Sequence, residues 1–140
     1  MNRIALLLSL SLVVATQARA DDFVVVRNAK SGGGTVSKAD LRGAFTGKVR
    51  EFSGNAVVVV LQGESNPAFA WLADSIFGVA PKLLASKIKQ EVFKGDMNKT
   101  VSAESDAEVI AKIKEAPGGI GVVSAAAAKD PALAIVTVGS

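Results

Sequence analysis

The chain has 140 residues, with 16 basic and 13 acidic side chains and neither cysteine nor histidine. Without these two residues it has no usual zinc ligand set, no Ser-His-Asp triad, no thiol chemistry and no disulfide. The acids show no recognisable pairing with a base, so we expect no catalytic residue, no metal site and no cofactor. The length suffices for one domain with one core.

The first twenty residues have the pattern of a secretory signal peptide. Arg3 precedes an apolar run over residues 4–15, and the small-residue cleavage pattern Ala18-Arg19-Ala20 follows it. The run is too short for a transmembrane helix, which needs about 20 apolar residues. We therefore expect a signal peptide over residues 1–20 and one domain over residues 21–140. The mature chain should be periplasmic and should not insert into a membrane.

Removal of this segment changes the charge balance. Residues 1–20 hold two basic residues and no acid, which leaves 14 basic and 13 acidic residues in the mature chain. A net charge of +1 does not indicate a nucleic-acid partner, which usually requires a basic patch or stripe.

Strand-like and helix-like segments alternate along the mature chain. The β-branched run at residues 23–26 predicts a strand, and the Gly-rich segment 31–35 predicts a loop. Ser37 is a typical N-cap, with Asp40 at the capping-box position, and Gly47 is a typical helix end. The unbroken apolar run at residues 57–61 predicts a strand buried on both faces.

The remaining elements follow the same alternation. Pro67 and Pro81 each stand where a first helical residue tolerates proline, and Gly78 and Gly95 end the two helices. Ser105 and Glu108 have capping-box spacing. Further strands are expected at residues 120–123 and 132–138. We expect an α/β domain with a mixed, largely parallel sheet flanked by helices.

Three stretches, in order, resemble the phosphate-transporter-type periplasmic solute-binding family. They are Leu41-Arg42-Gly43-Ala44-Phe45-Thr46-Gly47-Lys48 followed by Phe52-Ser53-Gly54, then Val92-Phe93-Lys94-Gly95, then residues 105–123 with Ala116-Pro117-Gly118-Gly119-Ile120-Gly121. The resemblance is to short members and implies one lobe of a type II periplasmic binding protein. The chain departs from the family pattern at Phe52, where Trp is usual, and at Val122, where Tyr is usual. The chain also departs from the family at residues 66–69, in the first turns of a helix where relatives often carry an Arg.

Glycines and hydroxyls near helix starts suggest anion binding. The free backbone N–H groups at a helix N-terminus can donate hydrogen bonds to an anion, and the helix dipole is positive at this end. Each candidate also has a simpler interpretation: a flexible loop at residues 31–35, ordinary capping at residues 65–66, and a helix stop at residues 117–119. The candidate ligand-binding residues are Ser31, Gly32, Gly33, Gly34, Thr35, Ser37, Ser65, Asn66, Gly118 and Gly119.

Two functions from different classes follow. The first is a non-enzymatic, periplasmic solute-binding protein related to ABC transport, which binds a small inorganic oxyanion such as phosphate. The second is an interaction module that docks to an envelope sensor or a membrane transporter component without tight ligand binding. Lysines at positions 82, 87, 89, 94 and 99 could steer anions, although a solvated helix face is the simpler interpretation.

Overall fold

The computed structural model describes residues 22–32 and 34–139. The segment expected to be a signal peptide, residues 1–20, lies outside the described residues and stays a prediction. Gly33, one of the candidate anion-binding residues, also lies outside them.

Six strands form one sheet in the order β2-β8-β1-β7-β5-β6. Strand β1 runs antiparallel to both of its neighbours, β7 and β8, whereas the pairs β2–β8, β5–β7 and β5–β6 are parallel. The expected mixed and largely parallel sheet is therefore confirmed. The strands are β1 (Phe23–Asn28), β2 (Gly34–Ser37), β5 (Val58–Gln62), β6 (Lys99–Ala103), β7 (Gly119–Ser124) and β8 (Leu133–Gly139).

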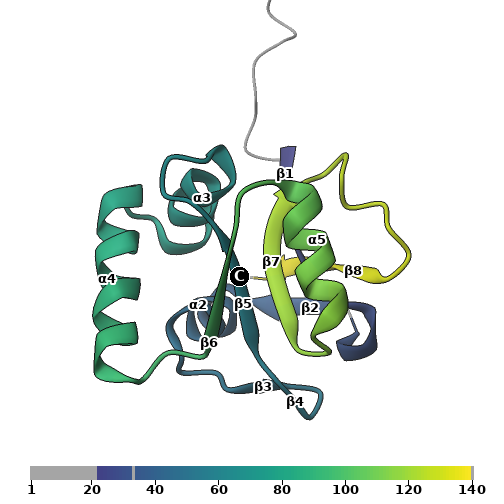
Figure 1. Cartoon of the computed structure of the whole chain (residues 1–140), viewed down its shortest axis with the longest axis horizontal. Coiled ribbons are helices and arrows are strands. Elements are labelled where there is room, and N and C mark those ends of the chain that lie inside the picture. The colour runs from purple at the N-terminus through teal and green to yellow at the C-terminus, as the bar shows by residue number, and fades with distance from the viewer. Residues whose placement is uncertain (1–21, 33, 140) are drawn as a thin grey trace, which may run out of the picture.

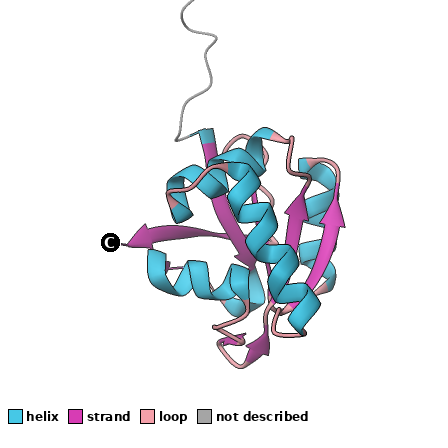
Figure 2. Cartoon of the chain, turned by 90° about the vertical axis from the view of Figure 1, so that its left-hand side faces the viewer, coloured by secondary structure: helices cyan, strands magenta, loops and turns pink. Residues whose placement is uncertain are grey.

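Helices cover both faces of the sheet, as Figures 1 and 2 show. One face carries α2 (Lys38–Thr46), α3 (Pro67–Trp71), the π-helix η4 (Leu72–Phe77) and α4 (Pro81–Lys94); the other carries α5 (Asp106–Glu115). The strand β5 contributes Val59 to the first core and Val60 to the second. This arrangement explains the unbroken apolar run of that strand, because both of its faces are buried.

The helix ends follow the chemistry expected from the sequence. The hydroxyl of Ser37 accepts a hydrogen bond from the N–H of Asp40 at 3.1 Å, and Gly47 ends α2 in the left-handed region with φ +89°. A Cβ at Gly47 would lie 2.1 Å from the carbonyl oxygen of Asp96, so only glycine fits this turn. The hydroxyl of Ser105 caps α5 in the same way.

Several elements were not predicted. Residues 34–37, expected to be loop and helix cap, form the edge strand β2, and residues 51–56 form a small hairpin of β3 (Glu51–Phe52) and β4 (Asn55–Ala56). Residues 29–31 form the short 3₁₀ helix η3 (Ala29–Ser31), and Lys99–Ala103 forms the other edge strand, β6. Short and half-polar edge strands lack the apolar pattern that sequence analysis depends on.

Within residues 22–32 and 34–139, no single helix is long and apolar enough to cross a membrane. The segments Pro67–Phe77 and Pro81–Lys94 satisfy the length and composition test only as a pair bent by 85°. Both contribute buried side chains to the core of the first face, including Phe69, Leu84 and Ile88.

Candidate functional site

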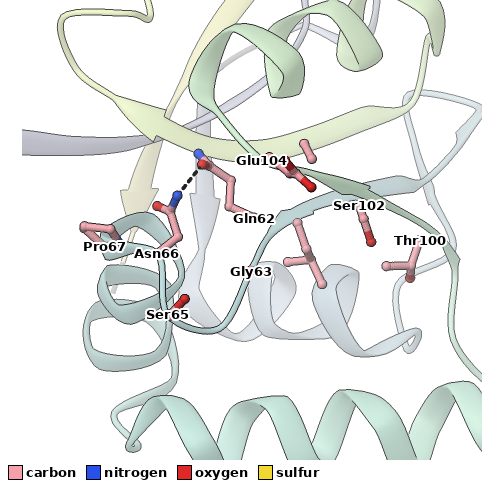
Figure 3. A pocket seen from close by; sticks show the side chains of 10 residues that line it. Gln62, Gly63, Ser65, Asn66, Pro67, Thr100, Ser102 and Glu104 are labelled. Atoms are coloured by element: carbon pink, nitrogen blue, oxygen red, sulfur yellow. Dashed lines mark hydrogen bonds between the residues drawn. The ribbon is translucent and has the colours of Figure 1, made fainter.

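A hollow of about 620 Å³ lies at the carboxyl ends of the parallel strands β5 and β6. Ligands of open α/β sheets usually bind outside the carboxyl ends of the strands. In Figure 3 the segment from Gly63 to Pro67 lies on one side of this hollow, and Thr100 and Ser102 extend from β6 on the other. The lining residues are Leu61, Gln62, Gly63, Ser65, Asn66, Pro67, Thr100, Ser102, Ala103 and Glu104.

The edge position of β6 opens this hollow. Thr100 and Ser102 pair with Val59 and Leu61 of β5, so they lie on the face of the sheet that carries α2, α3 and α4. Among the strands of residues 22–32 and 34–139, none follows β6 in the sheet. Its two hydroxyl-bearing side chains are therefore exposed beside the hollow. The Thr100 hydroxyl donates to the carbonyl of Asn98 at 3.0 Å, so of these two only the Ser102 hydroxyl can donate to a ligand there.

Side-chain hydrogen bonds tie the carboxyl ends of the strands together. The amide of Gln62, only 6% exposed, donates to the carboxylate of Asp106 at 2.7 Å and to the carbonyl of Val122 at 3.4 Å. The other carboxylate oxygen of Asp106 accepts from the N–H of Ser124 at 3.1 Å. The amide of Asn66 donates to the Gln62 carbonyl at 2.8 Å. A carboxylate can only accept, which fixes the orientation of both amides.

The N-terminal amides of α3 are already used. Pro67 has no N–H, and the side-chain oxygen of Asn66 accepts from the N–H of Ala68 at 2.9 Å. The next two amides, of Phe69 and Ala70, donate to the carbonyl of Asn66 at 3.0 and 3.2 Å. Hydrogen bonds to an anion at this helix start must therefore come from the loop before the helix. The N–H groups of Glu64 and Ser65 have no hydrogen-bond partner in the described part of the chain.

The hollow carries a negative charge. Glu104 contributes a carboxylate, and none of the described residues that line the hollow is a lysine or an arginine. A fully ionised anion would face this carboxylate without a compensating cation. An oxyanion that still carries a proton can instead donate that proton in a hydrogen bond to the carboxylate.

The Gly-rich loop predicted to bind an anion lies at the opposite, amino edge of the sheet. Because β1 is antiparallel to its neighbours, its end lies beside the starts of β7 and β8, with Arg27 opposite Ile120 and Asn28 opposite Leu133. The loop that follows β1 is therefore separated from Ser65 and Asn66, which follow the carboxyl end of β5.

The carbonyl oxygens of this loop point inward and accept hydrogen bonds from a buried side chain. This is not the arrangement of an anion site, in which backbone N–H groups point outward to the ligand. The guanidinium of Arg27, 5% exposed, donates to the carbonyls of Ser31 at 3.0 Å and Gly32 at 2.7 Å. It also lies 4.5 Å from the ring centroid of Phe52. Burial lowers the pKa of Arg27, and the carbonyls and the ring stabilise its charge in this position.

The hydroxyl of Ser31 is also engaged. It donates to the carbonyl of Pro117, and the amide of Asn55 donates to it at 3.3 Å, while Ser53 donates to the carbonyl of Ser31 at 2.9 Å. These bonds join the loop to the β3–β4 hairpin and to the start of β7. The contacts are those of a structural junction.

Packing requires glycine at Gly118, directly before β7, and at Gly119, its first residue. A Cβ at Gly118 would lie 1.8 Å from the carbonyl oxygen of Ala56, and a Cβ at Gly119 would lie 3.0 Å from the Cα of Ile113. Both residues are buried at the amino edge, near Ser31. They allow the chain to pass closely between the hairpin and α5.

The predicted site residues are thus distributed over two edges of the sheet. Ser65 and Asn66 lie at the 620 Å³ hollow, whereas Ser31, Gly32, Gly118 and Gly119 lie at the amino edge. Gly34, Thr35 and Ser37 belong to β2, with Ser37 at its carboxyl end opposite Gly139, and three strands separate β2 from β5.

Sequence analysis missed Gln62, Thr100, Ser102 and Glu104 at the hollow. Gln62 ends a strand that the sequence predicted. Its position at the carboxyl end of that strand could therefore have indicated a candidate site residue. Thr100, Ser102 and Glu104 belong to or follow β6, which was not predicted. Groups of three or more carboxylates that could hold a metal ion do not occur among the residues the structure describes.

Comparison with solved structures places the fold among phosphate-transport proteins. An ABC-type phosphate transport receptor from Vibrio cholerae matches 84% of this chain with a TM-score of 0.61 and 12% identity. PstS from Borrelia burgdorferi matches 86% with a TM-score of 0.62 and 19% identity. A phosphate ABC transporter substrate-binding protein with bound phosphate from Clostridium perfringens matches 84% with a TM-score of 0.64 and 13% identity.

The coverage of the other chains is 46%, 48% and 45%, so this chain spans less than half the length of each of these proteins. The chain has the fold of one part of a substrate-binding protein. This agrees with the single-lobe architecture that the sequence motifs implied. No family model matches the chain, and a search of curated proteins gave no match.

Proposed function

We propose that the chain is a non-enzymatic, periplasmic, single-lobe solute-binding protein that binds a small protonated oxyanion such as hydrogenphosphate. The hollow at the carboxyl ends of β5 and β6 supports this proposal. It combines the hydroxyls of Ser65 and Ser102 with the carboxylate of Glu104 in a fold shared with phosphate-transport proteins.

The geometry favours weak binding. The first amides of α3 are occupied, no cation lines the hollow among the described residues, and the hollow is open. The hydroxyls of Ser65 and Ser102 and two loop amides remain as donors in the described part of the chain, because the Thr100 hydroxyl already donates to the carbonyl of Asn98 at 3.0 Å. Without a bidentate arginine, which holds phosphate most strongly, we expect a dissociation constant of about 1 mM or weaker.

Glu104 predicts selectivity between anions. At neutral pH hydrogenphosphate carries a proton that can be donated to a carboxylate, whereas sulfate carries none. A hydrogen bond to a charged group contributes about 1.5–3 kcal/mol, which corresponds to roughly tenfold to hundredfold weaker binding of sulfate. Because an amide can donate to sulfate, Glu104→Gln should reduce this preference.

Calorimetric titrations of residues 21–140 with phosphate and with sulfate test the proposal. Glu115→Gln is the matched control, because Glu115 is exposed at the end of α5 and does not line the hollow. Equal affinities for the two anions, or an unchanged preference in Glu104→Gln, would contradict the assigned role of Glu104. Failure of every oxyanion to bind at about 20 mM would retire the proposed function.

Docking to an envelope sensor or a transporter component is the second candidate function. The occupied amides at the start of α3 favour it, because they remove the donors that a tight anion site would use. A single lobe also cannot enclose a ligand by hinge closure. Partner capture from envelope extract by a chain that binds no oxyanion would favour docking.

A further inference from the structure

The helix α4 exposes large apolar side chains on the side that faces away from the core. Phe93 is 93% exposed and Leu83 is 62% exposed, whereas Leu84 and Ile88 of the same helix are buried against the first core. α4 lies at one margin of the molecule in Figure 1 and on the side turned toward the viewer in Figure 2. It therefore exposes two apolar side chains beyond those it uses for folding, with the exposed Ser86 and Gln90 between them on the helix surface.

The spacing of residues places lysines on both flanks of these apolar side chains. At 3.6 residues per turn, Leu83 and Phe93 lie within a sector of about 80° and about 15 Å apart along the axis. Lys82 and Lys89 fall on one flank of this sector, and Lys87 and Lys94 fall on the other. The α4 outer face is defined by Lys82, Leu83, Lys87, Lys89, Phe93 and Lys94, all of them exposed.

Positive charge is concentrated on this helix. Residues 21–140 carry 14 basic and 13 acidic side chains, and α4 has four lysines and one acid, which leaves ten basic and twelve acidic residues elsewhere. The one acid, Glu91, pairs with Lys94 at 3.7 Å, and its side chain is 16% exposed. No other α4 lysine has an ion pair within the described ranges.

The positive surface continues from α4 toward α2. Lys87 shares a hollow of about 450 Å³ with Arg42 and Lys48, and Asp40 is the single acid among the described residues that line it. The Nε of Arg42 donates to the carbonyl of Ile76 at 2.7 Å, which holds this guanidinium at the hollow. Cations from two helices and the following loop thus extend the charge of the α4 outer face.

We propose that the α4 outer face docks on an anionic lipid surface. Amphipathic helices that bind such surfaces combine Phe or Leu with lysines, which keep their charged ends at the headgroups. Cores of protein–protein interfaces are depleted in lysine, whereas here four lysines flank two apolar side chains. The protein would rest on the bilayer with Leu83 and Phe93 inserted and the sheet outside it.

Co-sedimentation with vesicles tests the proposal. The buried apolar side chains of the described core lie within residues 25–136, so a chain that begins at Asp21 retains this core. We expect it to bind vesicles that contain phosphatidylglycerol and not vesicles of phosphatidylcholine alone. Leu83→Ser with Phe93→Ser should weaken binding at least tenfold. Lys82→Gln with Lys89→Gln should weaken it about 25-fold, since each lysine near an anionic leaflet contributes about fivefold.

Controls change similar residues elsewhere. Ile135→Ser removes a half-exposed apolar side chain of β8, and Lys30→Gln with Lys129→Gln removes two exposed lysines. Both control variants should bind as the parent does. Absence of binding, or equal losses in the test and control variants, would overturn the proposal. Light scattering that showed a dimer, abolished by Phe93→Ser, in a chain that ignores vesicles would assign the face to self-association instead.

Discussion

Replacement of Asp106 by alanine should destabilise the carboxyl edge of the sheet. Its two carboxylate oxygens accept from the Gln62 amide at 2.7 Å and from the Ser124 N–H at 3.1 Å. In the variant the buried Gln62 amide retains only the carbonyl of Val122, at 3.4 Å. The two hydrogen bonds that Asp106 accepts link α5 to β5 and to β7, so their loss affects all three elements.

The magnitude follows from these bonds. Hydrogen bonds to charged groups contribute about 1.5–3 kcal/mol each, and water can replace part of the bond to Ser124. An acid in the first turn of α5 contributes about 0.3–1 kcal/mol more. We expect Asp106→Ala to lower the free energy of unfolding by about 3 kcal/mol. Asp106→Asn should lower it by about 2 kcal/mol, because its one carbonyl oxygen can accept only one of the two bonds.

Urea denaturation followed by circular dichroism measures this change. The midpoint should fall by about 1–2 M for Asp106→Ala, whereas Glu115→Ala, at an exposed position of the same helix, should change stability by less than about 0.5 kcal/mol. A double-mutant cycle with Gln62→Ala should show a coupling energy of at least about 1 kcal/mol. A loss no larger than that of the control, or a coupling near zero, would refute the assignment of these bonds.

Two further predictions concern the packing of a glycine and the charge of a carboxylate. Gly118→Ala places a Cβ 1.8 Å from the carbonyl oxygen of Ala56 and should cost at least about 3 kcal/mol, whereas Gly63→Ala, which meets nothing within 4 Å, should be nearly neutral; equal urea midpoints would contradict this. The hydrogen bond from Lys114, at 2.7 Å, lowers the pKa of Asp130. A lowered carboxyl pKa stabilises the fold above the unfolded value, and this contribution is lost as the pH falls through the folded value. Asp130→Asn should therefore destabilise slightly at pH 7, and thermal melts should show the difference shrinking below about pH 4.

Sequence analysis identified the elements whose local chemistry is strong. Capping residues such as Ser37 and Ser105, together with glycines such as Gly47, marked helix ends that the structure confirms. The apolar run of β5 correctly indicated burial on both faces. The strand β6 was missed because Lys99, Thr100 and Ser102 interrupt its apolar pattern, and an edge strand needs less apolar surface.

The location of the site depended on strand direction, which the sequence did not reveal. The loop after β1 has glycines and hydroxyls typical of an anion site, but β1 is antiparallel to its neighbours and carries this loop to the amino edge. There Arg27 binds the carbonyls of Ser31 and Gly32. The arginine stands outside the Gly-rich segment, so the composition of the loop alone could not indicate this role. The sequence did indicate that Ser65 and Asn66 stand at the start of α3, because capping is local; their role in binding stays a prediction.

The most direct test of oxyanion binding at the carboxyl edge is a ¹⁵N NMR titration of residues 21–140 with phosphate at pH 7. We predict saturable amide shifts at residues 63–66 and 100–104, with half-saturation at about 1 mM or above. The shifts should weaken in Ser102→Ala and persist in Ser86→Ala, whose hydroxyl lies on α4 outside the hollow. Shifts confined to residues 29–35 and 117–119, or no shifts at about 20 mM phosphate, would contradict binding at this edge.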